Sequence, residues 1–285
     1  MTRLNNDFKT ANGTIKNTQE IGEALLKEEI TGIVIENFLT KKECEAIVNA
    51  FNEIELSEKT IVNEGFHTLP LSFAQFTQLK DSGKMSTKEY VKKAHEFRVK
   101  TPLMCGINLE QRLIEQFKDL FPEKTCDLMW NSECKNHLIP FNFRELKPGF
   151  GELVTHCENL FFSEFPSFFS WLNKHNVNNN RFSFFITLQN TELGGELCCY
   201  NLSWNTVRER VDFKTLRDIH GRTIVLKDAE ADLFKIKPKV GSLLLFNGGN
   251  IWHRVEKVMG EKSRITVGGF VSSSSQNNNK LLMWA

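Results

Sequence analysis

Residues Gly241-Ser-Leu-Leu-Leu-Phe-Asn-Gly-Gly-Asn-Ile-Trp-His-Arg-Val-Glu-Lys-Val258 contain two apolar runs separated by a glycine turn, the pattern of two short β-strands. Runs of this kind, bounded by Gly, Pro or Asn, recur from about Pro140 onward. Closely spaced strands favour a sandwich or barrel over a parallel sheet. We therefore predict a jelly roll built from the runs Phe141–Leu146, Gly151–His156, Phe182–Leu188, Glu196–Asn201, Gly241–Phe246, Trp252–Val258 and Ile265–Val271.

The first half of the chain has a helical pattern with one early strand, Thr31–Phe38. Thr40-Lys-Lys-Glu43 is a capping box that opens a helix to about Phe51, and Ser86-Thr-Lys-Glu89 opens a second helix. Apolar residues at helical spacing predict a third helix over Leu109–Leu120. Helices followed by strands predict an α+β protein with a double-stranded β-helix core of the jelly-roll, cupin-like type, buttressed by N-terminal helices.

A length of 285 residues with 40% hydrophobic content suits one compact catalytic domain. We expect residues 1–139 to be its mainly helical part and residues 140–285 to be its jelly-roll core. Phe161–Asn180 is interpreted as helix plus loop, and Ser203–Lys237 as a long polar insertion. This insertion and Phe66–Gln78 are the candidate lid segments.

The charge of the chain is balanced, with 36 basic and 35 acidic residues and a net charge of +1. Such a balance does not favour nucleic acid or an anionic membrane as a partner, so we expect a small-molecule substrate. There is no apolar run of about 18 residues that could span a membrane. Seven cysteines without paired spacing or a secretory leader argue against disulfides and for the cytoplasm. The sequence does not indicate an oligomeric state.

Two histidines and a carboxylate are the strongest chemical signal. On a strand that ends at His156, alternation places His156 and Glu158 on one side, whereas Cys157 points elsewhere. His253 lies 97 residues later, within a second strand. Two imidazoles and one carboxylate are the ligand set of non-haem Fe(II) oxygenases, which leaves metal positions open for a cosubstrate and for O2. We predict these three residues to be metal ligands and the catalytic centre.

Arg264 carries a positive charge on an otherwise apolar strand. A guanidinium group buried on such a strand needs an anionic partner. A dicarboxylate cosubstrate such as 2-oxoglutarate supplies one, because its distal carboxylate accepts the guanidinium fork. Thr266 faces the same side and can donate a hydroxyl. Arg144 has two interpretations: it binds a carboxylate near the iron, or it pairs with an acid such as Glu145 or Glu152.

The order His-x-Glu, a distant His and a following Arg-x-Thr resembles the Fe(II)/2-oxoglutarate-dependent dioxygenases. The resemblance extends over roughly Phe141–Ala285. It is strongest to the free-standing halogenases that act on hapalindole-type indole alkaloids, and to their hydroxylase relatives, in Leu193-Gly-Gly-Glu-Leu-Cys-Cys-Tyr-Asn-Leu-Ser-Trp204, the His253 and Arg264 blocks and Leu281-Leu-Met-Trp-Ala285. This resemblance implies an enzyme of secondary metabolism and places Phe161 and Ser183 in the wall of the substrate cavity.

One departure from the halogenase pattern decides the predicted outcome. Those halogenases have Gly where this chain has Glu158, and the missing carboxylate vacates the iron position that chloride takes. With that position filled, we expect hydroxyl rather than chlorine to reach the substrate carbon. Glu in place of the more usual Asp adds one methylene to the ligand arm.

Other candidates for the substrate pocket follow from position alone. Phe185 lies on a facing strand, Tyr200 and Trp204 follow a Gly-Gly turn, and His67 stands in Gly65-Phe-His-Thr-Leu69. Each of these also fits a plain core role, since most of the 24 Phe residues must be core.

Three classes of function fit these observations. The first is hydroxylation of a small metabolite, such as an amino acid, an alkaloid or a peptide-derived compound. The second keeps the same machinery for desaturation, cyclisation, epimerisation or hydroxylation of a protein side chain. The third is a cupin-like protein that binds a metal or ligand without turnover.

Overall fold

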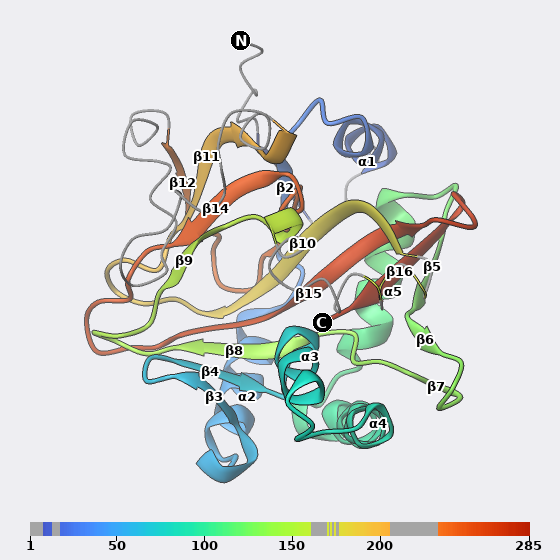
Figure 1. Ribbon diagram of the computed structural model, residues 1–285. Helices are drawn as coiled ribbons and strands as arrows, with labels where there is room; N and C mark the ends of the chain where they lie inside the picture. Colours follow the sequence, from blue (N-terminus) through green and yellow to red (C-terminus); the bar gives the residue numbers. More distant parts are fainter. Residues whose placement is uncertain are drawn as a thin grey trace.

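The computed structural model describes residues 8–12, 18–160, 170, 172, 174, 177–205 and 233–285. Within this part of the chain the fold is mixed α/β, with a large sheet, a smaller sheet and helices beside the large sheet (Figure 1). The chain end Ala285 lies in the interior, where its backbone N–H donates to Ile139.

The large sheet has ten strands and its main path runs β1-β2-β13-β10-β15-β8-β4-β3, with β16 beside β15 and β5 beside β16. Only β1 with β2 and β5 with β16 pair in parallel among these described strands. The bounds are β1 Phe8–Asn12, β2 Gly32–Glu36, β3 Thr60–Asn63, β4 Phe66–Leu69, β5 Thr125–Leu128, β8 Asn142–Leu146, β10 Val177–Gln189, β13 Leu243–Phe246, β15 Arg264–Ser274 and β16 Lys280–Trp284.

The small sheet has four strands in the order β12-β11-β14-β9, and a separate two-stranded ribbon pairs β6 with β7. From β8 to β15 the chain moves repeatedly between the two sheets, with β8, β10, β13 and β15 in the large one. The bounds are β9 Leu153–His156, β11 Leu197–Ser203, β12 Leu233–Ile236, β14 Ile251–Val255, β6 Trp130–Asn131 and β7 Asn136–His137.

Five helices are described, and they pack on the face of the large sheet that is turned away from the small sheet. Thr40 and Ser86 form the predicted capping boxes at α2 and α4, and α5 has the predicted bounds. The helices are α1 Thr18–Leu26, α2 Lys41–Asn52, α3 Phe73–Asp81, α4 Thr87–Cys105 and α5 Leu109–Leu120, and two 3₁₀ turns span Leu56–Glu58 and Glu158–Leu160.

Alternation along the central strands separates two cores. Phe184 of β10 points to the helices and packs its ring against Phe117 of α5, with centroids 5.4 Å apart. The next residue, Phe185, points to the opposite face and joins Leu244 of β13 and Cys199 of the small sheet. Burying such side chains contributes roughly 1.5–3 kcal/mol each. The second core, between the two sheets, is where the predicted residues His156, Glu158, His253, Arg264 and Thr266 lie.

The expectation of one strand in the first half is wrong. Besides β2, the chain before residue 140 contributes β1 and β3 to β7. Most of these strands are two to five residues long, too short to show an alternating pattern. The interpretation of Phe66–Gln78 as a lid is also wrong, because β4 is bonded to β8 within the sheet and Phe73 and Phe76 of α3 are buried.

The strands predicted from Pro140 onward are all present, with shifted ends. β10 begins at Val177, inside the segment interpreted as helix plus loop, and β12 pairs with β11 inside the expected polar insertion. Most of the remainder of these two segments, residues 161–169, 171, 173, 175–176 and 206–232, lies outside the described residues.

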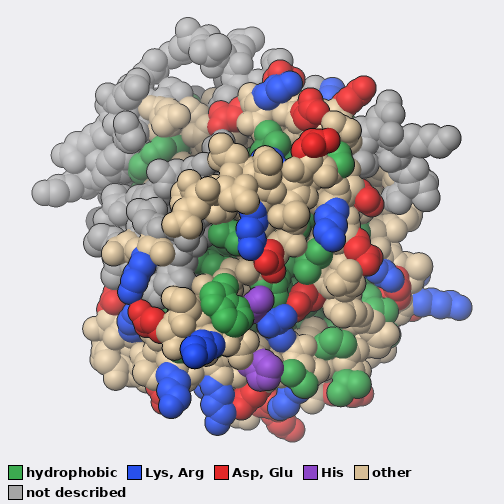
Figure 2. All heavy atoms as spheres, turned by 90° about the vertical axis from the view of Figure 1, so that its right-hand side faces the viewer, with side chains coloured by type: hydrophobic (Ala, Val, Ile, Leu, Met, Phe, Trp, Pro, Cys, Tyr) green, Lys and Arg blue, Asp and Glu red, His purple; other side chains and the backbone are tan. Residues whose placement is uncertain are grey.

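Two surface properties bear on partners. In the described part of the chain, none of the helices is long and apolar enough to cross a membrane. Figure 2 shows basic and acidic side chains interspersed over one face of the molecule, without a large area of a single sign. This distribution matches the net charge of +1.

Candidate metal and cosubstrate site

Three of the predicted residues meet between the two sheets. His156 ends β9 and His253 lies in the middle of β14, and the two are directly paired across these antiparallel strands. Their ring centroids are 4.4 Å apart. Glu158 begins the turn that follows β9. One ligand atom from each of the three lies within 4.8 Å of the others.

The two imidazoles are oriented by the same local contact. His156 Nδ1 lies 2.7 Å from the carbonyl oxygen of Val154, and His253 Nδ1 lies 2.8 Å from that of Ile251. A carbonyl only accepts hydrogen bonds, so each Nδ1 carries the proton and each Nε2 presents a lone pair. Histidine ligands of metals are typically held in this way.

The charge states suit a cation. Burial, together with the neighbouring His253, lowers the pKa of His156 to about 4, which keeps its imidazole neutral. Burial by itself raises the pKa of Glu158, but His253, His156 and the Ser183 hydroxyl outweigh it and the net pKa is lowered. The group therefore offers two imidazole nitrogens and one carboxylate as ligand atoms.

Glu158 is the clearest sign that something positive belongs at this site. The residue is only 4% exposed, and its Oε2 atom accepts no hydrogen bond from the described residues. His253 Nε2 lies 3.7 Å from Oε1, too far for a hydrogen bond. A buried carboxylate oxygen without a partner is costly. A divalent cation among the three ligand atoms would satisfy it, so the residues fit Fe(II).

Arg264 and Thr266 lie on the same face of β15, as alternation predicts, and are 5% and 1% exposed. The Arg264 guanidinium lies over the ring of Phe185, 4.9 Å from its centroid. Burial and the neighbouring Arg144 lower the pKa of Arg264 to about 10. No ion pair among the described residues includes Arg264. A buried cation that forms no ion pair can bind an external carboxylate.

Arg144 also faces this space. It stands opposite Thr266 in the pairing of β8 with β15, and its Nε donates to Asn142 Oδ1 at 2.8 Å. Burial lowers the pKa of Arg144 to about 10, and the charge of Glu158 partly opposes that shift. The acid next to it in sequence, Glu145, points to the other face of the sheet.

Ser183 and Phe185 of β10 also face the space between the sheets. Ser183 donates from Oγ to Glu158 Oε1 at 2.6 Å. Gly248, in the turn before β14, leaves room for this contact: a Cβ there would lie 2.1 Å from Ser183 Oγ and 2.8 Å from Glu158 Oε2. The sequence did not single out Gly248, since a Gly-Gly turn looks the same with or without a neighbouring carboxylate.

Three predicted pocket residues lie on the wrong face of their sheets. His67 pairs with Glu145 across β4 and β8, and its Nδ1 lies 3.5 Å from the Glu145 carboxylate, on the side away from Arg144. Tyr200 follows Cys199, the residue paired with His253, so it points outward from the small sheet. Trp204 stacks on Trp252 in the same outer cluster. Phe161 lies outside the described residues.

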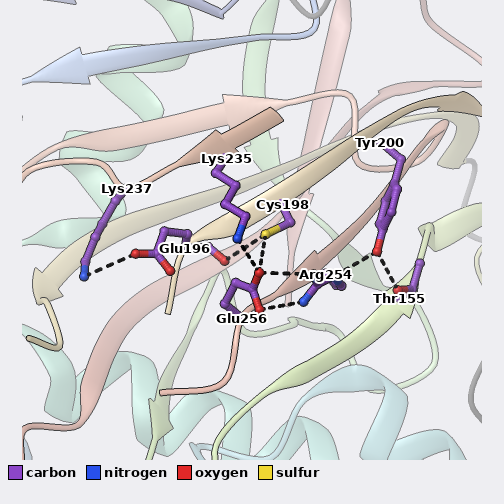
Figure 3. Close-up of polar contacts among 8 residues, drawn as sticks. All are labelled: Thr155, Glu196, Cys198, Tyr200, Lys235, Lys237, Arg254 and Glu256. Atoms are coloured by element: carbon purple, nitrogen blue, oxygen red, sulfur yellow. Dashed lines mark hydrogen bonds and ion pairs between the residues drawn. The ribbon is translucent and has the colours of Figure 1, made fainter. Parts of the chain in front are cut away.

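The outer face of the small sheet carries a continuous polar network (Figure 3). Arg254 donates to Tyr200 Oη at 2.8 Å and to both oxygens of Glu256, which also accepts from Lys235. Cys198 lies against Glu256, while Cys199 faces inward, so the two thiols point to opposite faces of the small sheet. Burial raises the pKa of Cys198 to about 12, and the thiol stays protonated.

The model of a family described as carrier-protein-independent halogenase WelO5 matches residues 9–285. No curated protein matches the chain in sequence.

Among solved structures, an N-substituted L-amino acid dioxygenase from Burkholderia ambifaria AMMD, in complex with alpha-KG, has 16% sequence identity and a TM-score of 0.59. The alignment covers 94% of this chain and 91% of that one. A second structure of that dioxygenase gives 14% identity, the same coverage and the same TM-score. A 2OG-Fe(II) oxygenase family protein from Burkholderia pseudomallei has 10% identity and a TM-score of 0.49, with 96% and 97% covered. The chain shares the dioxygenase fold.

Proposed function

This chain belongs to the WelO5 family of carrier-protein-independent halogenases, and we propose that within this family it is a hydroxylase. Its cofactors are Fe(II), 2-oxoglutarate and O2. The proposed reaction inserts a hydroxyl group at an unactivated C–H bond of a free small molecule. We further propose that strands β8 to β15, which are divided between the two sheets, form the double-stranded β-helix.

The observation that carries this proposal is the Glu158 carboxylate. It shares one site with His156 and His253. By resemblance, the halogenases have a glycine at this position. A carboxylate in that place occupies the position that a halide would need. When bound, Fe(II), 2-oxoglutarate and O2 supply a centre that removes hydrogen from carbon, while 2-oxoglutarate is converted to succinate and CO2.

The remaining inward residues have proposed roles in holding the cosubstrate. Arg264 binds the distal carboxylate of 2-oxoglutarate through its guanidinium fork, and Thr266 donates its hydroxyl to the same group. Phe185 lies under Arg264 and keeps water from that side of the ion pair. Arg144 supplies a second guanidinium for a carboxylate near the metal. Phe161 is retained as a proposed substrate contact, by resemblance alone.

The mass of the product tests the outcome. Purified enzyme is supplied with Fe(II), 2-oxoglutarate, O2, chloride and a set of amino acids, alkaloids and peptide-derived metabolites. We expect succinate release and a product that gains one oxygen atom. A product in which chlorine replaces hydrogen would establish halogenation, the second candidate, which the family description favours.

The same assay separates the remaining alternatives. A product that loses two hydrogens indicates desaturation or ring closure, and turnover of peptides but not of free metabolites indicates side-chain hydroxylation. A cupin-like binding protein would release no succinate with any compound.

A further inference from the structure

Hydrogen bonds hold Glu158 both at its backbone and at its carboxylate. At the backbone end, Glu158 N–H donates to Gly248 O and Asn159 N–H donates to Gly249 O, both at 3.1 Å. These two bonds fasten the turn after β9 to the turn before β14. At the other end, Oε1 accepts the Ser183 hydroxyl at 2.6 Å.

The hydroxyl that holds Oε1 comes from a rigid part of the protein. Ser183 lies in β10 and is paired on both sides, with Phe246 of β13 and Phe270 of β15. It is 7% exposed, so water hardly competes for the carboxylate. A donor on a central strand has less freedom than one on a loop, so the contact fixes direction as well as distance.

Gly248 leaves space beside the Glu158 carboxylate and the Ser183 hydroxyl. A side chain there would overlap both the Ser183 hydroxyl and the free oxygen of Glu158. The backbone of Gly248 has no left-handed conformation that would call for glycine. Space for the carboxylate is therefore the reason for glycine at this position.

We propose that Ser183 is a positioning residue that fixes the Glu158 carboxylate as a metal ligand, in the space that Gly248 leaves open. Glutamate has one more rotatable bond than aspartate, so its carboxylate needs an additional restraint to hold one orientation. Ser183 supplies that restraint, and it thereby keeps the ligand position filled against halide. This inference rests on the proposed function.

Cobalt(II) binding to the metal-free full-length chain tests the proposal without turnover. Affinity is measured by visible absorption for wild type, Ser183→Ala, Glu158→Ala and the double variant. Loss of a group that orients a ligand typically costs about 10- to 100-fold in metal affinity, and we expect Ser183→Ala to lie in that range. Because Ser183 acts through Glu158, the double variant should bind no more weakly than Glu158→Ala.

Ser242→Ala is the matched control, because it removes another buried hydroxyl from the same sheet region. It should bind cobalt like wild type, and circular dichroism checks that every variant is folded. Wild-type affinity in Ser183→Ala overturns the proposal, as does an equal loss with and without Glu158. Wild-type affinity in Glu158→Ala would instead overturn the assigned ligand set and with it the proposed function.

Discussion

The two faces of the small sheet are built from the same strands but differ in how their polar groups are satisfied. On the outer face, Arg254 and Glu256 form two hydrogen bonds with each other at 2.7 and 3.1 Å, and Tyr200 and Lys235 complete the network. On the inner face, one oxygen of Glu158 has no partner among the described residues.

This difference separates structural from functional charge. Charges that stabilise the fold find their partners within the chain, and charges that serve binding stay unpaired until a ligand arrives. Arg254 and Arg264 show the contrast most clearly, since both are guanidinium groups on β-strands, Arg254 in β14 and Arg264 in β15. Only Arg254 is paired with a carboxylate in the described structure.

We expect the largest loss of metal affinity at His253, whose neighbour Arg254 lies on the opposite face of β14. His253→Ala removes a proposed metal ligand, so we expect its loss of metal affinity and turnover to exceed the roughly 100-fold typical of residues that only orient a ligand. Arg254→Gln should bind metal like wild type. Titration with Fe(II) under argon compares the two. Equal losses in both variants would contradict the division between the faces.

Glu158→Gly should change the product as well as the rate. Removing the carboxylate vacates one metal position, and in chloride we expect hydroxylation to fall and a chlorinated product to form. Mass spectrometry of the products with chloride and with a chloride-free buffer measures this change. An unchanged hydroxylated product at the wild-type rate would show that Glu158 does not hold the metal.

Arg264→Gln should raise the KM for 2-oxoglutarate. Hydrogen bonds to a charged group are worth about 1.5–3 kcal/mol, which corresponds to a rise of roughly 10- to 150-fold. Succinate release at varied 2-oxoglutarate provides the measurement. Arg254→Gln is the matched control: its KM should stay at the wild-type value while its melting temperature falls. A KM change of the same size in both variants would contradict the assignment.

The smallest expected effect is the pH dependence of the outer network. Burial raises the pKa of Glu256, but hydrogen bonds from Arg254 and Lys235 outweigh burial and lower it to about 2. In the unfolded chain the pKa of a glutamate is about 4.3. The ionised form therefore stabilises the fold above that value, and this stabilisation is lost as the pH falls toward 2.

Glu256→Gln removes this stabilisation. The melting temperature of wild type should exceed that of the variant at pH 7, and the gap should narrow as the pH is lowered from 5 to 3. Solvent screening keeps the gap small, because the carboxylate is partly exposed. A gap that widens in acid would contradict the proposed ion pairs.

The sequence could predict those features that depend on alternation and on charge in apolar surroundings. His156 and Glu158 lie two positions apart, and the lone charge of Arg264 marks its strand, so both signals are local. The strand pattern also predicted where His253 would lie. Capping boxes at Thr40 and Ser86 gave the starts of two helices.

Other features depended on information that the sequence does not carry. Which face of the small sheet is inner is set by the pairing of His253 with His156, so Tyr200 could not be assigned to the outer face in advance. The first-half strands are held by partners far along the chain, as β5 is by β16. The Ser183 contact with Glu158 likewise joins separate strands.

Anaerobic absorption spectroscopy of the protein with Fe(II) and 2-oxoglutarate tests the assignment of the inner face most directly. We predict that a weak visible charge-transfer band forms in wild type, and that added chloride leaves the band unchanged because Glu158 holds the ligand position. A folded sample without the band would contradict the iron and 2-oxoglutarate site. A band that shifts when chloride is added would contradict the assignment as a hydroxylase.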